Sequence, residues 1–458
     1  MDFDQLFKKY QSKGAEYLDV RFLKSTNEKI VLENKNPSIS LSNSDIYGVR
    51  VFYKGAWGFS SGVDLQNISS SFEKAFNHAV KISKLIKDKF KLQKFSNYQA
   101  NLKAPCKRLT SSVDLKDKIK DAYYLDSLLK DNPQINNRII MFRFNDLVKN
   151  FLNSEGANIT EEFSFSKIVT QVFQNVNGSP IMGLSNHGGS YGYDIFNEDN
   201  LIKFSKEALE DLNHQIKAEM APAGNMPILM DKSLTGVFFH EAVGHACEAD
   251  HILQNISVLK DKLNQPIAPS FINLKDSPKI PNENGFYRYD DEGMPANETS
   301  LIKEGVLIGF MHSMETASKF NLNPTGNGRA MDPFSQPIPR MSNTILEKGD
   351  ISVDEAISNI KRGIYAQGSA GGVVTPNDGS FLFNAQRAFL IENGKRTKLL
   401  KGVSFGGDIL KTLKNITAVC NDAAPVGVGG SCGKNGQLVS VGEYAPSLLV
   451  SEVTVGGS

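Results

Sequence analysis

The residues of this chain best suited to chemistry lie together in one short stretch, from Val237 to Asp250. The stretch contains two histidines, two glutamates, an aspartate and a cysteine among apolar or small residues. Placing so many polar side chains beside an apolar segment costs free energy unless a ligand or a partner uses them. The combination of imidazole, carboxylate and thiol groups indicates a metal site.

His240 and His245 are the first two candidate metal ligands, but their spacing is unusual. In the familiar His-Glu-x-x-His metalloprotease pattern the histidines are four apart, about 40° from each other around a helix. Five positions correspond to about 140° on an ideal helix. We therefore expect a helix from about Ser233 that distorts near Gly244, where glycine frees the backbone, so that both rings reach one ion. The alternative is an ordinary buried helix whose histidines bond to backbone groups.

A catalytic zinc has three protein ligands and one open position for water, so a third donor is needed. Cys247, Glu248 and Asp250 are near in sequence. Cys432 lies in the glycine-rich segment 428–437, where small residues allow a thiolate to approach closely. Spacing alone ranks Cys432 only slightly above Cys247.

Composition restricts the class of protein that carries this stretch. With 458 residues, two or three domains are expected, and 40% hydrophobic and 22% charged residues are typical of a globular protein. The 51 basic and 50 acidic residues give no bulk field for nucleic acid or an anionic membrane. No apolar run reaches the length of a signal peptide or a membrane span. Four scattered cysteines favour a reducing cytoplasm, which is the expected location.

The first half of the chain must provide a scaffold of sheets and long helices. Residues 1–96 are predicted to form an N-terminal α/β subdomain, and residues 97–221 a central region of antiparallel sheet and helix, ended by Ala221 and Pro222. Helical spacing and strand alternation predict helices at 3–10, 67–90, 115–129 and 200–220, and strands at 17–23, 29–33, 46–53, 56–60, 138–152, 158–165 and 167–175.

The second half, residues 222–458, is glycine-rich and strand-rich and is predicted to be the metal-bearing domain. A strand at 227–230 leads into the metal helix. Hairpins at 301–311 and 381–400, and strands at 438–441 and 448–455, indicate a curved or barrel-like sheet. The fold class expected for the whole chain is α+β.

The segment from His240 to His245 resembles the His-Glu-x-x-x-His signature of the TldD/PmbA metalloprotease family, historically labelled modulators of DNA gyrase. Further blocks resemble TldD-type members in the same order along the chain. These blocks are Tyr289–Pro295, Gly326–Arg329 with Pro339–Thr344, Phe383–Gly394 and Ser431–Gln437. The likeness is dense over 226–457 and weaker before it.

The resemblance implies that His240, His245 and Cys432 hold one divalent metal ion per chain, and that Glu241 is the catalytic base. PmbA-like companions lack the metal motif, so its presence implies a catalytic member. The family also implies a homodimer, or a heterodimer with such a companion, around a cavity that admits unfolded peptides. Cys247 departs from the pattern, where a small residue is expected, and is a possible rival ligand or oxidation-sensitive thiol.

The expected function is zinc-dependent hydrolysis of short or unfolded peptides bound in extended conformation. Two imidazoles and a thiolate suit zinc. Arg329 and Arg340 are candidate substrate contacts, with structural salt bridging as their commoner role.

Two other functions remain open from the sequence. A binding or regulatory subunit would use the metal structurally, with Glu248 or Cys247 closing the site as a fourth ligand. An oxidoreductase would use Glu241 and His245, four apart on a helix, as ligands for iron or manganese.

Overall fold

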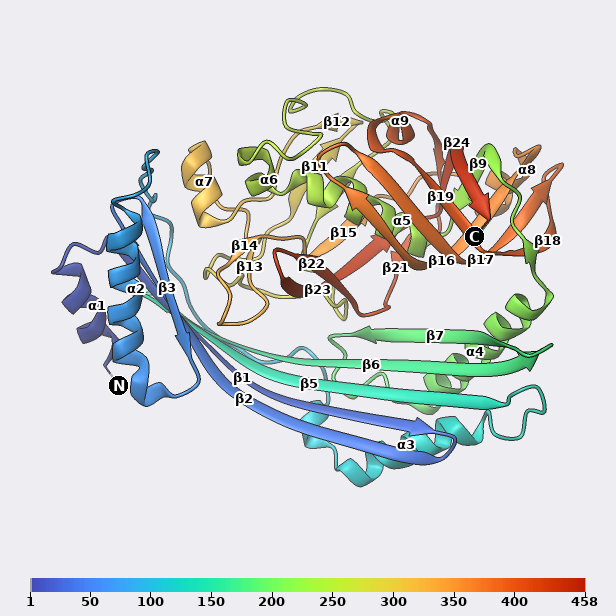
Figure 1. Ribbon diagram of the computed structural model, residues 1–458, viewed down its shortest axis with the longest axis horizontal. Helices are drawn as coiled ribbons and strands as arrows, with labels where there is room; N and C mark the ends of the chain where they lie inside the picture. The colour runs from blue at the N-terminus through green and yellow to red at the C-terminus, as the bar shows by residue number, and fades with distance from the viewer. Residues whose placement is uncertain (1, 458) are drawn as a thin grey trace.

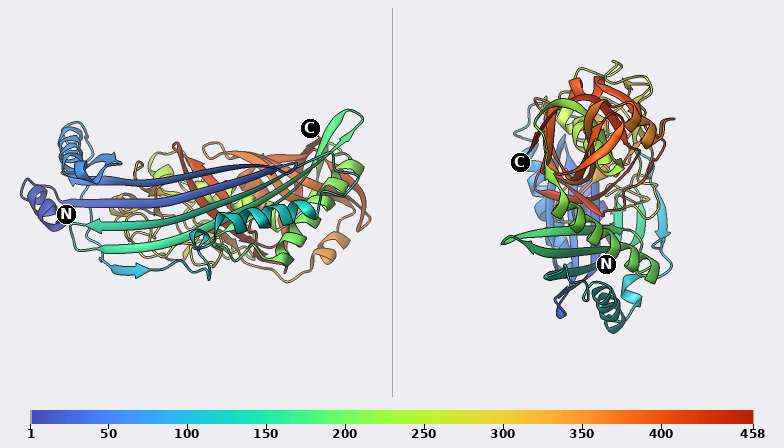
Figure 2. Two further views of the ribbon diagram at one scale, coloured as in Figure 1. Left: turned by 90° about the horizontal axis from the view of Figure 1, so that it is seen from below. Right: turned by 90° about the vertical axis from the view of Figure 1, so that its right-hand side faces the viewer.

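The computed structural model describes residues 2–457, which form two stacked layers (Figure 1). A long curved sheet from the N-terminal half, with its helices, forms the lower layer in this view. The C-terminal half lies on the concave side of that sheet. The right-hand view of Figure 2 also shows the C-terminal half above the sheet. The mixed α and β content with antiparallel sheets confirms the expected fold class.

The curved sheet has unusually long strands, of 17 to 19 residues in β1, β2, β5 and β6, where about 5–6 is typical. Tight turns join these strands, and Asn34, Lys35, Asn177 and Gly178 adopt the positive φ that such turns need. The strand order is β3-β2-β1-β5-β6-β4, with β7 on β6. The bounds are β1 Tyr17–Glu33, β2 Asn36–Tyr53, β3 Ala56–Gly62, β4 Gln99–Leu102, β5 Asn137–Asn153, β6 Asn158–Val176 and β7 Ser179–Gly189.

Four helices cover this sheet and its ends (Figures 1 and 2). They are α1 Phe3–Gln11, α2 Ile68–Ile82, α3 Leu115–Ser127 and α4 Glu198–Lys217. The helix predicted at 67–90 therefore ends earlier, at Ile82. Because β1 pairs with β5, one sheet crosses the predicted boundary after residue 96, and the division into three units stays a prediction.

The C-terminal half contains a closed five-stranded barrel, as expected from the strand-rich sequence. The strands run β16-β9-β24-β19-β17, and pairing of β16 with β17 closes the circle. The barrel strands are β9 Gly224–Met230, β16 Arg362–Thr375, β17 Ser380–Glu392, β19 Val403–Asp408 and β24 Leu448–Gly457, extended by β8 Glu219–Met220, β18 Lys395–Lys401 and β20 Ile416–Val419.

A second C-terminal sheet lies beside the barrel and carries the segment predicted to supply a thiolate. Its order is β12-β11-β10-β15-β23-β21, with β22 paired to β23. The strands are β10 Leu274–Asp276, β11 Thr299–Lys303, β12 Val306–Leu307, β15 Asn343–Leu346, β21 Ala424–Pro425, β22 Gly430–Lys434 and β23 Gln437–Ala445, and a separate pair is β13 Gly328–Arg329 with β14 Ile338–Pro339. The helices of this half are α5 Lys232–Phe239, α6 Ala249–Leu253, α7 Met314–Phe320, α8 Val353–Ser358 and α9 Ile409–Lys414.

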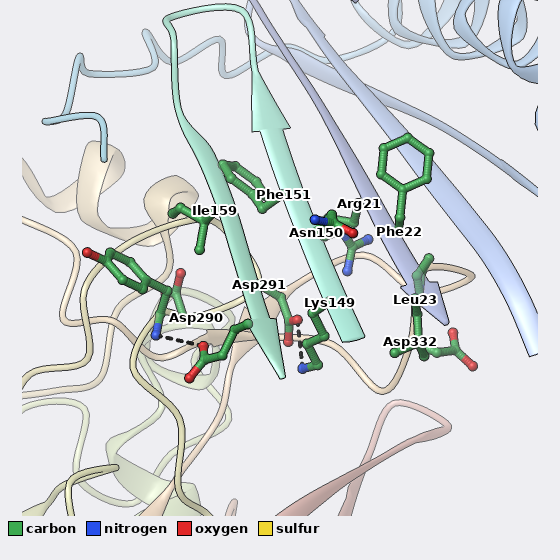
Figure 3. A pocket seen from close by; sticks show the side chains of 13 residues that line it. Arg21, Phe22, Leu23, Lys149, Asn150, Phe151, Ile159, Asp290, Asp291 and Asp332 are labelled. Carbon is green, nitrogen blue, oxygen red and sulfur yellow. Dashed lines mark hydrogen bonds and ion pairs between the residues drawn. The ribbon is translucent and has the colours of Figure 1, made fainter. Parts of the chain in front are cut away.

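Buried charges join the two layers. The Arg50 guanidinium on β2 donates to Asp19 on β1 at 3.0 Å and to Glu292 of the C-terminal half at 2.8 Å. Lys149 on β5 donates to Asp291 at 3.0 Å, beside a small cavity of about 30 Å³ (Figure 3). The conspicuous acidic block at 289–295 therefore anchors the C-terminal half to the curved sheet.

Among residues 2–457, no helix has both the length and the apolar composition that crossing a membrane requires.

Candidate metal centre

Helix α5 delivers the histidines into the middle of the C-terminal half. Its start is fixed by Asp231, whose side chain accepts a hydrogen bond from the Leu234 N–H at 3.0 Å. The helix packs against β16 and β23, and Phe238 and Phe239 at its end are fully buried. The residues that follow Phe239 are thus enclosed by both C-terminal sheets.

The helix changes its winding at the predicted metal motif. Residues His240–Gly244 form a π-helical turn, and the His245 N–H donates to the His240 carbonyl, five positions back. Residues that close such a turn lie above each other, which removes the angular conflict of five-residue spacing on an α-helix. The two imidazole rings have centroids 5.5 Å apart and are nearly perpendicular, at 88°.

Gly244 serves this turn in a different way from the one expected. Its φ is −56°, an ordinary helical value, so the turn does not use the backbone freedom of glycine. A Cβ added at Gly244 would lie 2.0 Å from the Met341 sulfur. A side chain at position 244 would force Met341, which is fully buried, to move, so glycine is favoured here by the lack of space.

Cys432 on β22 completes the cluster. Its Sγ lies 3.1 Å from His245 Nε2, although the two residues are 187 positions apart in sequence. Ligand atoms of His240, His245 and Cys432 all lie within 4.8 Å of one another. The structure thus brings together the three predicted metal ligands.

The chemistry of this cluster suits a cation. Burial alone would raise the pKa of the Cys432 thiol, but the neighbouring His240 and His245 lower it to about 4. The thiol is therefore held as a thiolate, the form that binds metals. Within residues 2–457 the cluster has three donors, with Cys247 and Glu248 outside it, so these two residues do not close it as a fourth ligand.

Partners on the far side of each ring orient the histidines. His245 Nδ1 lies 2.9 Å from Glu248 Oε2, and His240 Nδ1 lies 3.4 Å from the Thr344 hydroxyl. Glu248 is fully buried, and Lys434 Nζ lies 3.1 Å from it. Burial would raise the pKa of the Glu248 carboxyl, but His245 and Lys434 lower it to about 2. A permanent carboxylate thus fixes the His245 ring, with Nε2 turned to the cluster.

Glu241 lies at the rim of the cluster. Its carboxylate is 3.7 Å from His245 Nε2, and 30% of the side chain is exposed, compared with 10% for His245. Glu241 therefore has access both to solvent and to the space beside the donors. This is the arrangement that a general base beside a metal requires.

The two predicted arginines have different surroundings. The Arg329 guanidinium donates to the carbonyls of Met341 and Ser440, and Arg329 also lines a cavity. Arg340 is fully buried and donates to the Cys432 carbonyl at 2.6 Å. Arg340 therefore holds the strand that carries the thiolate.

Cys247 is fully buried behind the cluster, and burial raises the pKa of its thiol. The protonated thiol packs in the apolar core of the C-terminal half.

Several residues around the cluster were not predicted from the sequence. Thr344 and Lys434 orient it, Glu443 adds a carboxyl group near His240, and Glu283 lies beside Glu443. Burial, together with Glu443, raises the pKa of Glu283 to about 8. Thr344 and Lys434 fall within the blocks singled out in the sequence, which is the signal that could have identified them.

Comparison with known proteins gives two family matches. The PmbA/TldA metallopeptidase C-terminal domain matches residues 223–457, and the PmbA/TldA metallopeptidase domain 1 matches residues 18–83. The first match contains the whole cluster, and the second lies in the curved sheet and α2.

Relatives of similar length are named as metalloproteases. A metalloprotease of Methanocaldococcus jannaschii is 36% identical over 449 residues, covering 94% of each chain. A zinc metalloprotease TldD homolog of Saccharolobus solfataricus is 27% identical and covers 98% of each chain. The relatives named as metalloproteases imply that a metal ion is bound.

Solved structures share the fold. A proposed modulator of a DNA gyrase from Thermotoga maritima superposes with a TM-score of 0.81 at 22% identity, covering 99% of each chain. TldE from Thermococcus kodakarensis superposes with a TM-score of 0.76 at 17% identity, covering 99% of this chain and 100% of that one.

Proposed function

The chain belongs to the PmbA/TldD metallopeptidase family, and we propose that it is a zinc-dependent peptidase that hydrolyses extended, unfolded peptides. The observation that carries the proposal is the convergence of three donor atoms within 4.8 Å, beside a carboxylate that is open to solvent.

His240, His245 and Cys432 would hold the ion. Two imidazoles and a thiolate are a donor set that zinc favours, and three protein ligands leave one position open. Zinc held there supplies a Lewis acid that activates water and polarises a carbonyl group. Glu248 and Thr344 keep both rings facing the donors, and Arg340 keeps the Cys432 strand in place.

Glu241 is proposed as the general base of the His-Glu-x-x-x-His motif. Its carboxylate accepts a proton from the attacking water and returns it to the leaving amine. The partial exposure of Glu241 supports this role, because water reaches its oxygen atoms.

The edge of β22 is proposed as the binding site for the peptide backbone. Within residues 2–457, β22 pairs with β23 only. Asn435 and Gly436 form its two-residue turn with positive φ, so Cys432 and Val439 are a hydrogen-bonded pair. The backbone groups of Ser431 and Gly433, on either side of Cys432, therefore point to the free edge. An extended peptide added there would run directly past the thiolate.

Arg329 is proposed to contact substrate from the cavity that it lines, and Arg340 to position Cys432 in place of touching substrate. We also propose a cytoplasmic homodimer, or a heterodimer with a PmbA-like companion that lacks the motif. Light scattering of the purified chain, alone and with such a companion, tests the assembly.

The test of the function compares wild type with Glu241→Gln on unstructured peptides. The variant is expected to keep one zinc per chain, measured by metal analysis, and to lose about 10²–10⁴-fold in kcat. Glu73→Gln, an exposed glutamate on α2, is the control and should leave both quantities unchanged.

Unchanged cleavage by Glu241→Gln would exclude the proposed base. Loss of zinc in that variant would instead assign Glu241 as a ligand. Cleavage by wild type must also disappear after chelation and return with zinc.

A further inference from the structure

A cavity of about 270 Å³ lies between the hairpin that carries Cys432 and the concave face of the curved sheet. Leu438 and Ser440 of β23 line it from the hairpin, and Leu147 of β5 with Phe163 and Phe165 of β6 line it from the sheet. The next residue on that face of β6, Lys167, donates to the Gly429 carbonyl just before β22. The cavity therefore lies directly beneath the strand pair that holds the thiolate.

The hairpin has two faces with different surroundings. Cys432 and Val439 lie opposite each other, so their side chains share one face, and both are buried. Ser431 and Ser440 lie opposite each other on the other face, next to Leu438, which is 59% exposed. Cys432 thus lies on the metal face of these two strands, while Leu438 and Ser440 line the cavity from the other face, and Val439 between them also borders the cavity.

A peptide that pairs with the free edge of β22 must also direct its side chains alternately to the two faces. Successive side chains of a strand point to opposite faces, and residues opposite each other share a face. A peptide residue beside Ser431 or Gly433 would therefore direct its side chain towards the cavity, while its neighbour in sequence would point to the metal side.

We propose that this cavity is a selectivity pocket that takes a bulky apolar or aromatic side chain of the peptide next to the cleaved bond. The proposal rests on the proposed peptidase function and adds a substrate class to it: unfolded peptides with such a side chain at one fixed position.

The volume of the cavity and the aromatic part of its wall fit this occupant, although polar side chains such as Asn145 and Asn284 also line it. Phe163 and Phe165 form a stacked pair with centroids 5.7 Å apart, which offers an aromatic ring a flat partner. An apolar cavity of about 150 Å³ is enough to hold benzene, so the larger cavity here accommodates a phenylalanine or leucine side chain.

The charges that line the cavity disfavour basic side chains. Lys149, bonded to Asp291, and Arg329, bonded to two backbone carbonyls, are the charged residues at its wall. Among residues 2–457, those that line the cavity include no carboxylate. A lysine or arginine side chain would lose water there without gaining a counter-charge.

A set of unstructured peptides that differ at a single position tests the pocket. Cleavage sites are mapped by mass spectrometry, and kcat/KM is compared for phenylalanine, leucine, alanine and lysine at each position around the cut. At one position, phenylalanine and leucine should exceed alanine by about 10–100-fold, with lysine below alanine.

If the cavity binds this side chain of the peptide, Leu438→Glu should reverse the order of kcat/KM between phenylalanine and lysine. Leu438 is exposed, so the fold tolerates the change, and the new carboxylate should raise lysine relative to phenylalanine at least tenfold at the same position. Val169→Ala is the matched control, because Val169 lies on the same face of β6 beyond the cavity. It should leave the preference unchanged.

Binding gives a readout without turnover. Fluorescence anisotropy of labelled peptides on Glu241→Gln should show the same order of affinity, and the same reversal in the double variant with Leu438→Glu. Cleavage by wild type with equal rates for all four side chains would overturn the pocket and leave the peptidase intact. Absence of cleavage, with selective binding retained, would overturn the peptidase and leave the pocket.

Discussion

The distance between the His240 and His245 rings depends on how the turn between them packs against Met341. The π-helical turn passes so near the Met341 sulfur that Gly244 has no space for a side chain. Met341 follows directly after Arg340, which holds the Cys432 carbonyl. One short segment therefore packs against the turn with the histidines and also holds the strand with the thiolate.

Gly244→Ala is predicted to lower the free energy of unfolding by about 1–3 kcal/mol, because the added methyl group overpacks against Met341. Met341→Ala alone removes a fully buried side chain and should cost about 2–5 kcal/mol. The double variant should be less destabilised than the sum, since the space left by Met341 accepts the new methyl group. Urea unfolding of all four proteins measures this, and strict additivity would contradict the steric role of Gly244.

Among individual residues, the sequence identified the side chains that could bind a metal but not the side chains that orient them. Histidine, glutamate and cysteine are identifiable by type, and the motif singled out His240, Glu241 and His245. Glu248 lies close by, but its role in orienting His245 depends on Lys434 from β22, which no local spacing could indicate. Supports that converge from separate elements require the fold.

At the scale of elements, strand existence was predictable and strand length was not. Alternation predicted two strands at 17–23 and 29–33, whereas β1 is continuous from Tyr17 to Glu33. The polar residues between them lack a hydrophobic pattern, yet β1 is paired on both sides, with β2 and β5, along almost its whole length. Pairing with neighbours extends the strand where local preference does not.

A buried histidine before α7 gives the fold a predicted dependence on pH. Burial lowers the pKa of His312 to about 4, and its ring packs edge-on against Phe320 of α7. The unfolded chain takes up this proton near pH 6.5, while the folded chain does not. Stability from His312 is therefore complete above about pH 6.5 and falls by about 1.4 kcal/mol per pH unit towards pH 4.

Chemical denaturation between pH 4.5 and 7.5 measures this dependence. His312→Phe keeps a ring beside Phe320 and removes the titrating group. The slope of the free energy of unfolding against pH should therefore decrease by up to about 1.4 kcal/mol per pH unit between about pH 4 and 6.5. An unchanged slope would show that other groups carry it.

In the molecule as a whole, the two layers are joined by ion pairs that are buried away from solvent. The side chains of Arg50, Asp19 and Glu292 are at most 3% exposed. Arg50→Leu leaves two carboxylates buried without their partner and is predicted to cost about 3–5 kcal/mol. Arg396→Leu is the control, because the Arg396–Asp354 pair is largely exposed, with 40% and 92% of the side chains accessible. That change should cost less than about 1 kcal/mol.

Zinc affinity should be unaffected by Arg50→Leu, since every donor of the cluster belongs to the C-terminal layer. Thermal unfolding measures the loss of stability, and a zinc competition assay on the same samples measures the zinc affinity separately. Reduced zinc affinity in a folded Arg50→Leu protein would mean that the curved sheet shapes the metal centre directly.

The 187 positions between His245 and Cys432 also set an order of events in time. A ribosome makes the chain from its N-terminus, so both histidines emerge long before the thiol that joins them. A growing chain is itself unfolded polypeptide, the material that the finished enzyme is proposed to cut. Because the cluster needs Cys432 of β22 as well as the histidines that follow α5, a growing chain cannot bring the three donors together until the segment around Cys432 has been made.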